Sequence, residues 1–149
     1  MRYRAVFEHS GEGIAILRDG RFVDCNEASL QLYRCDRSTL LGKSPFDISP
    51  PIQPGGRRSV DLTLDHLANA AGNGGLRFEW VHRRFDGSEF DGEVVLSPTS
   101  IEGIPHFVAT VRDVTARKQA ALALLDSTRQ LEASHATLRA IHVLSRRLN

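Results

Sequence analysis

Two short apolar runs near the start of the chain predict a β-hairpin. The runs cover residues 13–18 and 21–25, and Asp19 and Gly20 separate them. An Asp-Gly pair between apolar runs favours a two-residue turn, because both central residues of a type I′ turn need a positive φ. We therefore expect two paired strands here. A short helix over residues 3–9 should precede them as a cap.

The segment after the hairpin predicts helices rather than strands. Asn26 directly follows the second run and suits the N-cap of a helix over residues 27–33. Between residues 35 and 54, four prolines allow only short helical turns and loop, which we expect to wrap over one face of the sheet. A longer helix is expected over residues 59–71. Its apolar residues at helical spacing, which should face the core, are Val60, Leu64, Leu67 and Ala71.

Three more strands are expected in the second half of the chain. Residues 76–84 and 88–96 flank a second Asp-Gly pair at 86–87, so we expect another hairpin with the same turn chemistry. A connection over residues 98–103 leads to residues 104–113, where two sets of side chains alternate as in a strand. With helices inserted between the second and third of about five strands, the pattern indicates an α+β organisation.

The last segment, residues 115–149, predicts one long helix. It contains no Gly or Pro and is rich in Ala, Leu, Arg and Gln, which are strong helix formers. Leucines recur every seven residues, whereas the positions between them are mostly polar, so we expect a weak, adjustable coiled-coil seam that pairs with a second copy of the chain. The seam leucines are Leu124, Leu131 and Leu138, and the polar positions are Thr128, His135 and His142.

Composition and charge remove several function classes. The chain has 149 residues, of which 41% are hydrophobic and 25% charged, which suits one folded domain with an extension. The net charge of +1 is spread along the sequence, so we expect no nucleic-acid partner. No run of about 18 apolar residues and no secretion signal is present, so we expect no membrane insertion and a cytoplasmic location. Cys25 and Cys35 lack the spacing of a metal site and are too few for a disulfide framework.

Four stretches resemble the characteristic segments of one known family. They read DGRFVDCNEA at 19–28, LLGK at 40–43, FEWVHRRFDGS at 78–88 and VRDVTARK at 111–118. In this order and spacing they are similar to the segments of PAS domains, the sensory modules of bacterial-type signalling proteins. The resemblance implies a five-stranded antiparallel sheet with helices packed on one face, enclosing a pocket or a packed core. We expect a cap over residues 1–12, the PAS domain over 13–114 and a signalling helix over 115–149.

The resemblance also implies a relay where the last strand ends. Asp113 and Thr115 match the family's relay motif, which couples the last strand to the helix that follows. The expected partner of Asp113 is a basic residue before the 86–87 turn, either Arg83 or Arg84. Such a pair would hold the strand end where the exit helix begins. Asp113 can also simply cap that helix, and the two roles are compatible.

Cofactors have to be argued from residues, because the family binds flavin, haem, organic acids or nothing identifiable. Flavin photoreceptors of the family carry a reactive Cys in the segment NCRFLQ, whereas residues 42–47 here read GKSPFD, so no covalent flavin chemistry is expected. Cys25 and Cys35 should be small buried residues. His66 lies on the helix that supplies the haem ligand in haem-binding members and is the haem candidate. We expect no cofactor or a small organic ligand before haem or flavin, and no metal.

A ligand in this domain should be small and mostly apolar, with a polar end. Trp80 and His82 share a strand face with Phe78, and a buried indole N–H and imidazole need polar partners. Filling of the core is the alternative role for these rings. The expected lining residues are Ile16, Val23, Tyr33, Leu41, Leu67, Phe78, Trp80, His82, Leu96 and Phe107.

The pattern as a whole favours a non-catalytic sensory and regulatory module. It would bind a small molecule or mediate homodimerisation, and relay a signal through its last helix to an output domain of a longer chain, as in two-component systems and transcription regulators. One alternative is a haem- or flavin-based redox or gas sensor. Another is a histidine kinase fragment with His135 or His142 as phosphoacceptor. Residues 135–139, HATLR, lack the acid and the later Pro typical of that site, which disfavours the kinase.

Overall fold

A computed structural model describes residues 4–148 of the chain. Residue 3 of the expected cap helix and residue 149 of the expected last helix lie outside the described residues. The chain divides into two compact units, residues 1–114 and 115–149. The elements of the first unit are α1 (Arg4–His9), β1 (Gly13–Arg18), β2 (Arg21–Cys25), α2 (Glu27–Tyr33), α3 (Arg37–Leu40), the 3₁₀ turn η1 (Pro45–Ile48), α4 (Ser59–Asn73), β3 (Leu76–Arg83), β4 (Glu89–Ile101) and β5 (Ile104–Asp113). The second unit is the helix α5 (Thr115–Leu148).

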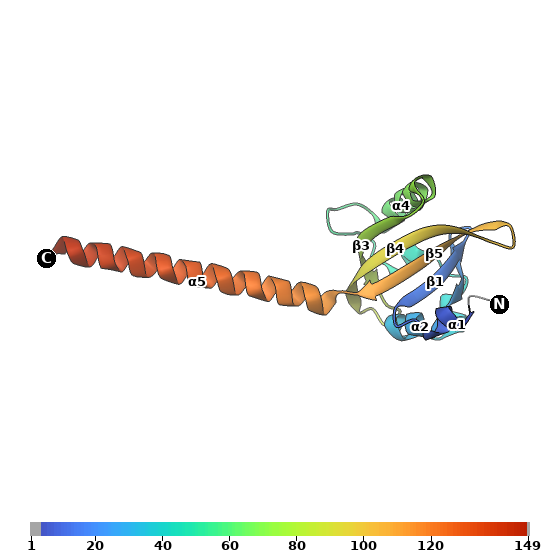
Figure 1. Ribbon diagram of the computed structural model, residues 1–149, viewed down its shortest axis with the longest axis horizontal. Coiled ribbons are helices and arrows are strands. Elements are labelled where there is room, and N and C mark those ends of the chain that lie inside the picture. Colours follow the sequence, from blue (N-terminus) through green and yellow to red (C-terminus); the bar gives the residue numbers. More distant parts are fainter. Residues whose placement is uncertain (1–3, 149) are drawn as a thin grey trace. The chain divides into compact units, whose positions relative to one another are not determined.

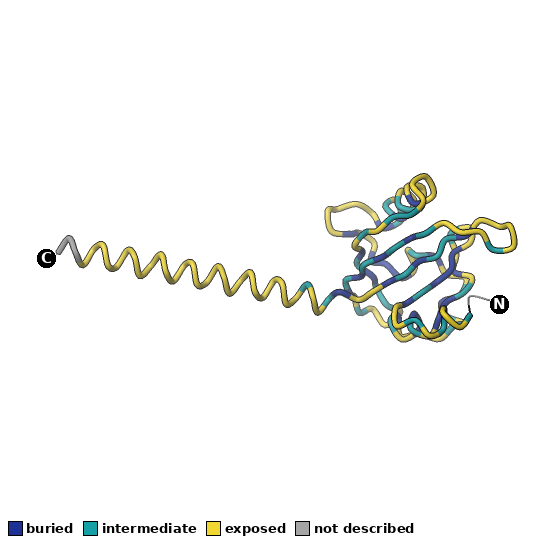
Figure 2. The backbone as a smooth tube through the Cα atoms, in the orientation of Figure 1, coloured by how far each residue is buried: buried dark blue, intermediate teal, exposed yellow. Residues whose placement is uncertain are grey.

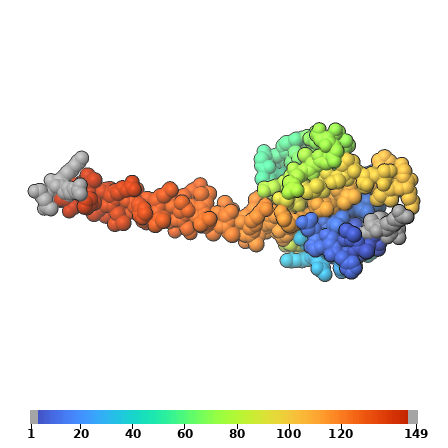
Figure 3. Space-filling view, viewed as in Figure 1, coloured from blue at the N-terminus to red at the C-terminus, as the bar shows by residue number. Residues whose placement is uncertain are grey.

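The five strands form one antiparallel sheet in the order β2-β1-β5-β4-β3 (Figure 1). The core lies between one face of this sheet and the helices inserted between β2 and β3, and buried positions follow the strands (Figure 2). In the space-filling view α4, in green, packs against β4, in yellow (Figure 3). This arrangement confirms the expected fold class.

The first hairpin is formed as predicted. Asp19 and Gly20 have φ values of 52° and 76°, so both central residues of the turn have the positive φ of a type I′ turn. Beyond the turn Leu17 pairs with Phe22, but Ile16 pairs with Asp24. Val23 is therefore an extra residue in β2, a β-bulge that shifts the side-chain alternation of this strand.

Asn26 joins three elements through its buried side chain. As predicted, it caps α2, because its Oδ1 accepts the Ser29 N–H at 3.0 Å. The same oxygen accepts the Ile14 N–H at 2.9 Å, and Nδ2 donates to the carbonyls of Phe7 and Glu12 at 2.8 and 3.0 Å. One amide thus ties α1, β1 and α2 together.

The face that α4 turns to the core differs from the prediction. The helix spans Ser59–Asn73 and so confirms the predicted element, but Leu64 is 58% exposed and Ala71 is also exposed. Its buried residues are Ser59, Thr63 and Ala70. The Ser59 hydroxyl donates to the Pro50 carbonyl and accepts from the Gln53 side chain at 3.0 Å, which stabilises a polar residue at a core position. Of the predicted stripe, Leu67 alone packs against the core cluster.

The two remaining turns also differ from expectation. At the β3–β4 hairpin the Gly87 N–H donates to the Arg84 carbonyl at 3.0 Å, and Gly87 has a φ of 89° while Asp86 has no positive φ. This is a longer turn closed by glycine, not a copy of the first one. Residues 98–103 were expected as a connection, but β4 continues to Ile101 and turns at Glu102 and Gly103, whose φ values are 52° and 76°.

Each edge strand of the sheet is hydrogen-bonded at one residue to another part of the chain. Along β2 the Phe22 N–H donates to the Lys43 carbonyl and the Gly42 N–H donates to the Phe22 carbonyl, each at 2.8 Å. Along β3 the side-chain amide of Gln53 accepts the Val81 N–H and donates to the Val81 carbonyl, each at 2.9 Å. These contacts occupy backbone groups that an edge strand would otherwise expose.

The second unit is the predicted single helix. It runs without a break over Thr115–Leu148, and the exposed side chains include Leu124, Leu131 and Leu138 at 70%, 58% and 63%. In the part of the chain that the structure describes, no helix has the length and apolar character needed to cross a membrane.

Replacing Asn26 tests how much this one amide contributes to the fold. We expect Asn26→Ala to lower the free energy of unfolding by about 3 kcal/mol, because a helix cap and several buried hydrogen bonds are lost together. Asp36→Ala is the matched control, since Asp36 caps α3 from an exposed position and its loss should destabilise the domain clearly less. Urea unfolding of the two variants measures the difference, and equal losses would contradict the prediction.

Candidate functional site

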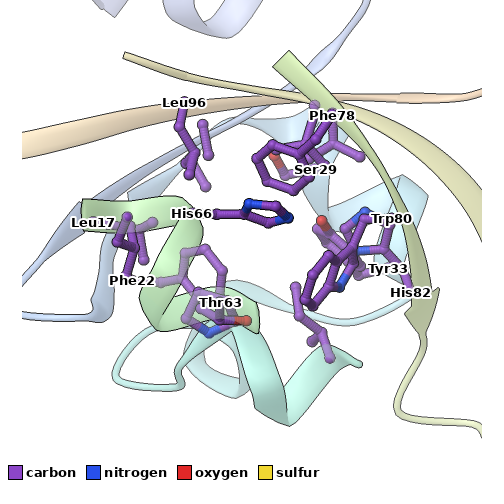
Figure 4. Close-up of a pocket in the computed structure, with 18 residues that line it drawn as sticks. Leu17, Phe22, Ser29, Tyr33, Thr63, His66, Phe78, Trp80, His82 and Leu96 are labelled. Atoms are coloured by element: carbon purple, nitrogen blue, oxygen red, sulfur yellow. The ribbon is translucent and has the colours of Figure 1, made fainter. Parts of the chain in front are cut away.

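A cavity lies between the sheet and the helices of the first unit (Figure 4). Its volume is about 50 Å³, and its lining comes from both sheet and helices. Figure 4 shows Leu17 and Phe22 on one side, Tyr33, Trp80 and His82 on the other, and the His66 ring between them. The remaining lining residues are Gly13, Ala15, Ser29, Pro45, Ile48, Thr63, Leu67, Phe78, Val94, Leu96, Ala109 and Val111.

Part of the predicted lining is found at this cavity. Tyr33, Leu67, Phe78, Trp80, His82 and Leu96 line it. Ile16, Val23, Leu41 and Phe107 do not. Leu41 and Phe107 instead pack against the core cluster around it.

The error at Ile16 and Val23 has a structural cause. Ala15 and Leu17 of β1 face the cavity, so Ile16 between them points to the opposite face, although it is also buried. Val23 is the bulged residue of β2 and is 44% exposed, and Phe22 takes the cavity position instead. Because residues on both faces of β1 are buried, hydrophobicity alone does not indicate which of its side chains face the cavity.

Ser29 and Thr63 line the cavity but were missed, because they are polar. Thr63 lies four residues after Ser59 and seven before Ala70, so these small residues share one face of α4. This spacing of small side chains was the available signal. His66, proposed above only as a haem ligand, lines the cavity from the same helix.

Two of the lining polar groups have protein partners. The Trp80 Nε1–H donates to the Ser49 hydroxyl at 2.8 Å, and that hydroxyl donates to the Pro45 carbonyl at 2.7 Å. The Ser29 hydroxyl donates to the Ile14 carbonyl at 2.8 Å. These groups are therefore held in place by the fold itself.

His82 is buried without a hydrogen bond. It is 4% exposed, and neither ring nitrogen has a partner. Burial lowers its pKa from 6.5 to about 3, with Asp113 acting in the opposite direction and Arg84 adding to the decrease. The ring lies against Gly92, where a Cβ would come within 2.6 Å of His82 Cδ2. His82 is thus a neutral imidazole at neutral pH.

His66 is held by aromatic contacts rather than by ionic ones. Its ring stacks on Phe78 with centroids 4.0 Å apart and lies edge-on to Trp80 at 5.8 Å. Burial lowers its pKa. A cavity of about 50 Å³ is far smaller than the roughly 300–1,000 Å³ of sites for drug-sized ligands. The residues present therefore do not fit haem or flavin.

The structure brings Arg84, and not Arg83, to Asp113. Arg84 Nη2 lies 3.7 Å from Asp113 Oδ2, and Arg84 Nε donates to the Leu32 carbonyl at 2.7 Å. Arg83 forms a surface ion pair with Glu89 at 3.1 Å. The Arg84 side chain is 10% exposed, so its charge sits in a partly desolvated position between the end of α2 and the end of β5.

Arg84 is also connected to the cavity through one aromatic ring. The rings of His82 and Phe90 stack with centroids 4.8 Å apart and planes 14° apart. The guanidinium carbon of Arg84 lies 4.5 Å from the centroid of Phe90 on its way to Asp113. Tyr33 contacts both rings, at 5.7 Å from His82 and 5.9 Å from Phe90. A continuous packed chain thus runs from the cavity to the end of β5.

The other candidate residues lie apart from this site. Cys25 and Cys35 are free thiols, and burial raises the pKa of both, that of Cys25 to about 11, so the reactive thiolate is disfavoured. His135 and His142 are exposed on α5, and Thr115 is its first residue. Within residues 4–148, no three His, Cys, Asp or Glu side chains are grouped to hold a metal ion.

Comparison with known proteins is consistent with this geometry. A PAS domain structure of an HTR-like protein from Haloarcula marismortui is 28% identical, with a TM-score of 0.62 over 75% of this chain and 88% of that one. A domain of a sensory box sensor histidine kinase/response regulator from Geobacter sulfurreducens is 25% identical, with a TM-score of 0.61 over 75% and 91%. A PAS domain of a LuxR-family transcriptional regulator from Burkholderia thailandensis, in complex with ethanol, is 21% identical, with a TM-score of 0.61 over 76% and 98%.

No curated protein matches the chain. The family model described as PAS domain matches residues 11–116, which include the whole sheet and the cavity. This match covers well over half of the sequence. The chain therefore belongs to the PAS domain family.

Proposed function

We propose that this chain is a non-catalytic sensory module that binds a small molecule in its cavity and transmits the binding event to α5. The observation that carries the proposal is the packed path from His82 through Phe90 to Arg84 and Asp113. It starts at a cavity with unpartnered polar atoms and ends two residues before α5 begins. Occupancy of the cavity and the conformation of the strand end are then coupled by direct contact.

The size and chemistry of the cavity favour a small organic ligand over haem or flavin. Its lining is mainly apolar, with few polar groups, which is the usual composition of small-molecule sites. The ethanol complex of the Burkholderia thailandensis PAS domain is an example of so small a ligand in this fold. We therefore propose that the ligand is an organic molecule of a few heavy atoms.

The output is proposed to pass through α5 to another domain of a longer chain. Leu124, Leu131 and Leu138 form an exposed row at heptad spacing, which is the pattern of a helix that pairs with a second helix. Polar residues between them weaken such a seam, so a small change at the strand end can shift the pairing. We propose a homodimer joined through this row.

Variants at the two arginines before the β3–β4 turn test the path to the strand end. We expect Arg84→Gln to speed hydrogen exchange of the Val114 N–H about tenfold, because a charge-assisted contact next to this strand end is lost. That N–H donates to the Asp91 carbonyl of β4 at 2.8 Å, so its exchange rate reports on the pairing of the chain with β4 directly after the end of β5. Exchange is followed by two-dimensional NMR.

Arg83→Gln is the matched control, because Arg83 is the last residue of β3, directly before Arg84, but pairs at the surface. It should change the exchange rate by less than about twofold. Asp113→Asn removes the ion pair from the other side and should resemble Arg84→Gln. The same exchange rate in all three variants would rule out a role for Arg84 in the relay.

The neutral state of His82 predicts a specific loss of stability in acid. The unfolded chain binds a proton at His82 below about pH 6.5, whereas the folded chain does not until about pH 3. The free energy of unfolding should therefore fall as the pH drops through this range, by up to about 1.4 kcal/mol per pH unit from His82 alone.

In His82→Phe this contribution should disappear, and the pH dependence between 6.5 and about 4 should become flatter than in the parent chain. His9→Phe provides the control, since His9 is exposed and lies outside the cavity. Urea unfolding at a series of pH values measures both. Parallel curves for His82→Phe and the parent chain would show that His82 is not buried in its neutral form.

A charge placed in the leucine row tests the proposed dimer. We expect Leu131→Asp to weaken self-association at least about tenfold, because an apolar contact at the seam is replaced by a charge. Ala133→Asp introduces the same charge two residues later, on a different face of the helix, and should change little. Sedimentation equilibrium distinguishes them, and an equal effect of the two substitutions would contradict pairing through this row.

A further inference from the structure

We propose that His66 determines which ligands the cavity accepts, because its own ring occupies a site that would otherwise bind a planar aromatic ring. This role rests on the proposed sensory function, and it restricts the natural ligand to a small molecule without a ring. The position of the His66 ring, the two aromatic residues beside it and the volume left free all support it.

The ring of His66 projects into the cavity from α4 and lies between its two sides (Figure 4). Burial lowers the pKa of His66, while the charges of Asp65 and Arg57 act on it in opposite directions. These two charges also pair with each other, at 2.6 Å. At neutral pH the cavity therefore contains an uncharged imidazole ring that belongs to the protein itself.

Phe78 and Trp80 of β3 form an aromatic corner around this ring. Their ring centroids are 5.9 Å apart and their planes differ by 79°. The His66 ring stacks on Phe78, with centroids 4.0 Å and planes 29° apart, and lies edge-on to Trp80, at 5.8 Å and 67°. Stacked and edge-on contacts are the two arrangements that aromatic rings prefer. Another planar ring of this size would find the same two contacts in the corner.

The aromatic corner is held in place by the sheet and not by His66. Both of its residues lie within the ladder between β3 and β4. The Trp80 Nε1–H also donates to the buried Ser49 hydroxyl at 2.8 Å. Truncation of His66 should therefore leave the two rings of the corner where they are.

The volume beside His66 is too small for a ring. It is about 50 Å³, whereas a cavity that holds one benzene molecule measures about 150 Å³. The five-membered ring of His66 fills much of the space that a ring ligand would need. A small molecule without a ring fits the cavity as it is, whereas a ring-shaped ligand would have to take the place of His66.

Removal of the His66 ring tests this role directly. Pyrazole, an uncharged isomer of imidazole, is titrated into the full-length parent chain and into His66→Ala at neutral pH. Trp80 is the single tryptophan and lines the cavity, so its indole N–H resonance reports on occupancy. We expect saturable binding to His66→Ala and at least about tenfold weaker binding to the parent chain, in which the corner is already filled.

Two controls separate the aromatic corner from volume alone. Tetrahydrofuran has the same number of ring atoms but is puckered and not aromatic, so it should bind His66→Ala about fivefold more weakly than pyrazole. Leu67→Ala enlarges the cavity from the next residue of α4 but leaves the corner filled. It should bind pyrazole no more tightly than the parent chain does.

Equal affinity of pyrazole for the parent chain and His66→Ala would overturn the proposed role of His66, and so would saturable binding to neither. Equally tight binding of pyrazole by Leu67→Ala, or of tetrahydrofuran by His66→Ala, would also overturn it, since volume alone would then decide. If His66→Ala does not fold, His66→Val takes its place, because it removes most of the ring and keeps an apolar contact with Phe78. The exchange rates of the Arg84 and Arg83 variants judge the sensory relay separately.

Discussion

The part-buried guanidinium of Arg84 is the contact that joins the end of α2, the strand β4 and the end of β5. It contacts the Leu32 carbonyl in the last turn of α2, the ring of Phe90 and the carboxylate of Asp113. A charge that is only 10% exposed needs all of these partners, because removing it from water is costly unless the surroundings replace its solvation. The helix end, the strand pair and the strand end are therefore held in one relative position. The ring of Phe90 contacts both Arg84 and His82.

Much of the fold could be predicted because the decisive signals are local. Asp19 and Gly20 adopt the positive φ values that a tight turn requires, and Asn26 caps the next helix through its own side chain. The identical Asp-Gly pair at 86–87 forms a different turn, because Arg84 and Ser88 pair and lengthen the loop. The turn at Glu102 was not placed, since Glu, unlike Asp or Asn, is not typical of positive φ.

The candidate site was harder to predict, because hydrophobicity does not mark the few polar residues in its mainly apolar lining. The inward face of α4 carries Ser59 and Thr63, whereas Leu64 faces solvent. The bulge at Val23 then shifts β2, a change that depends on pairing with β1 and not on β2 alone. The aromatic residues of β3 were placed correctly, because Trp80 and His82 alternate with partly exposed neighbours in the way that a half-buried strand requires.

At one residue of each edge, the sheet is already hydrogen-bonded to another part of its own chain. A free edge strand recruits extended peptides or a second sheet by continuing the backbone hydrogen-bond ladder. Here the backbone of Gly42 and Lys43 occupies one edge at Phe22, and the amide of Gln53 occupies the other at Val81. Strand addition would first have to displace these groups. At Phe22 and Val81, pairing with a further strand would therefore exchange existing hydrogen bonds for new ones and not simply add to them.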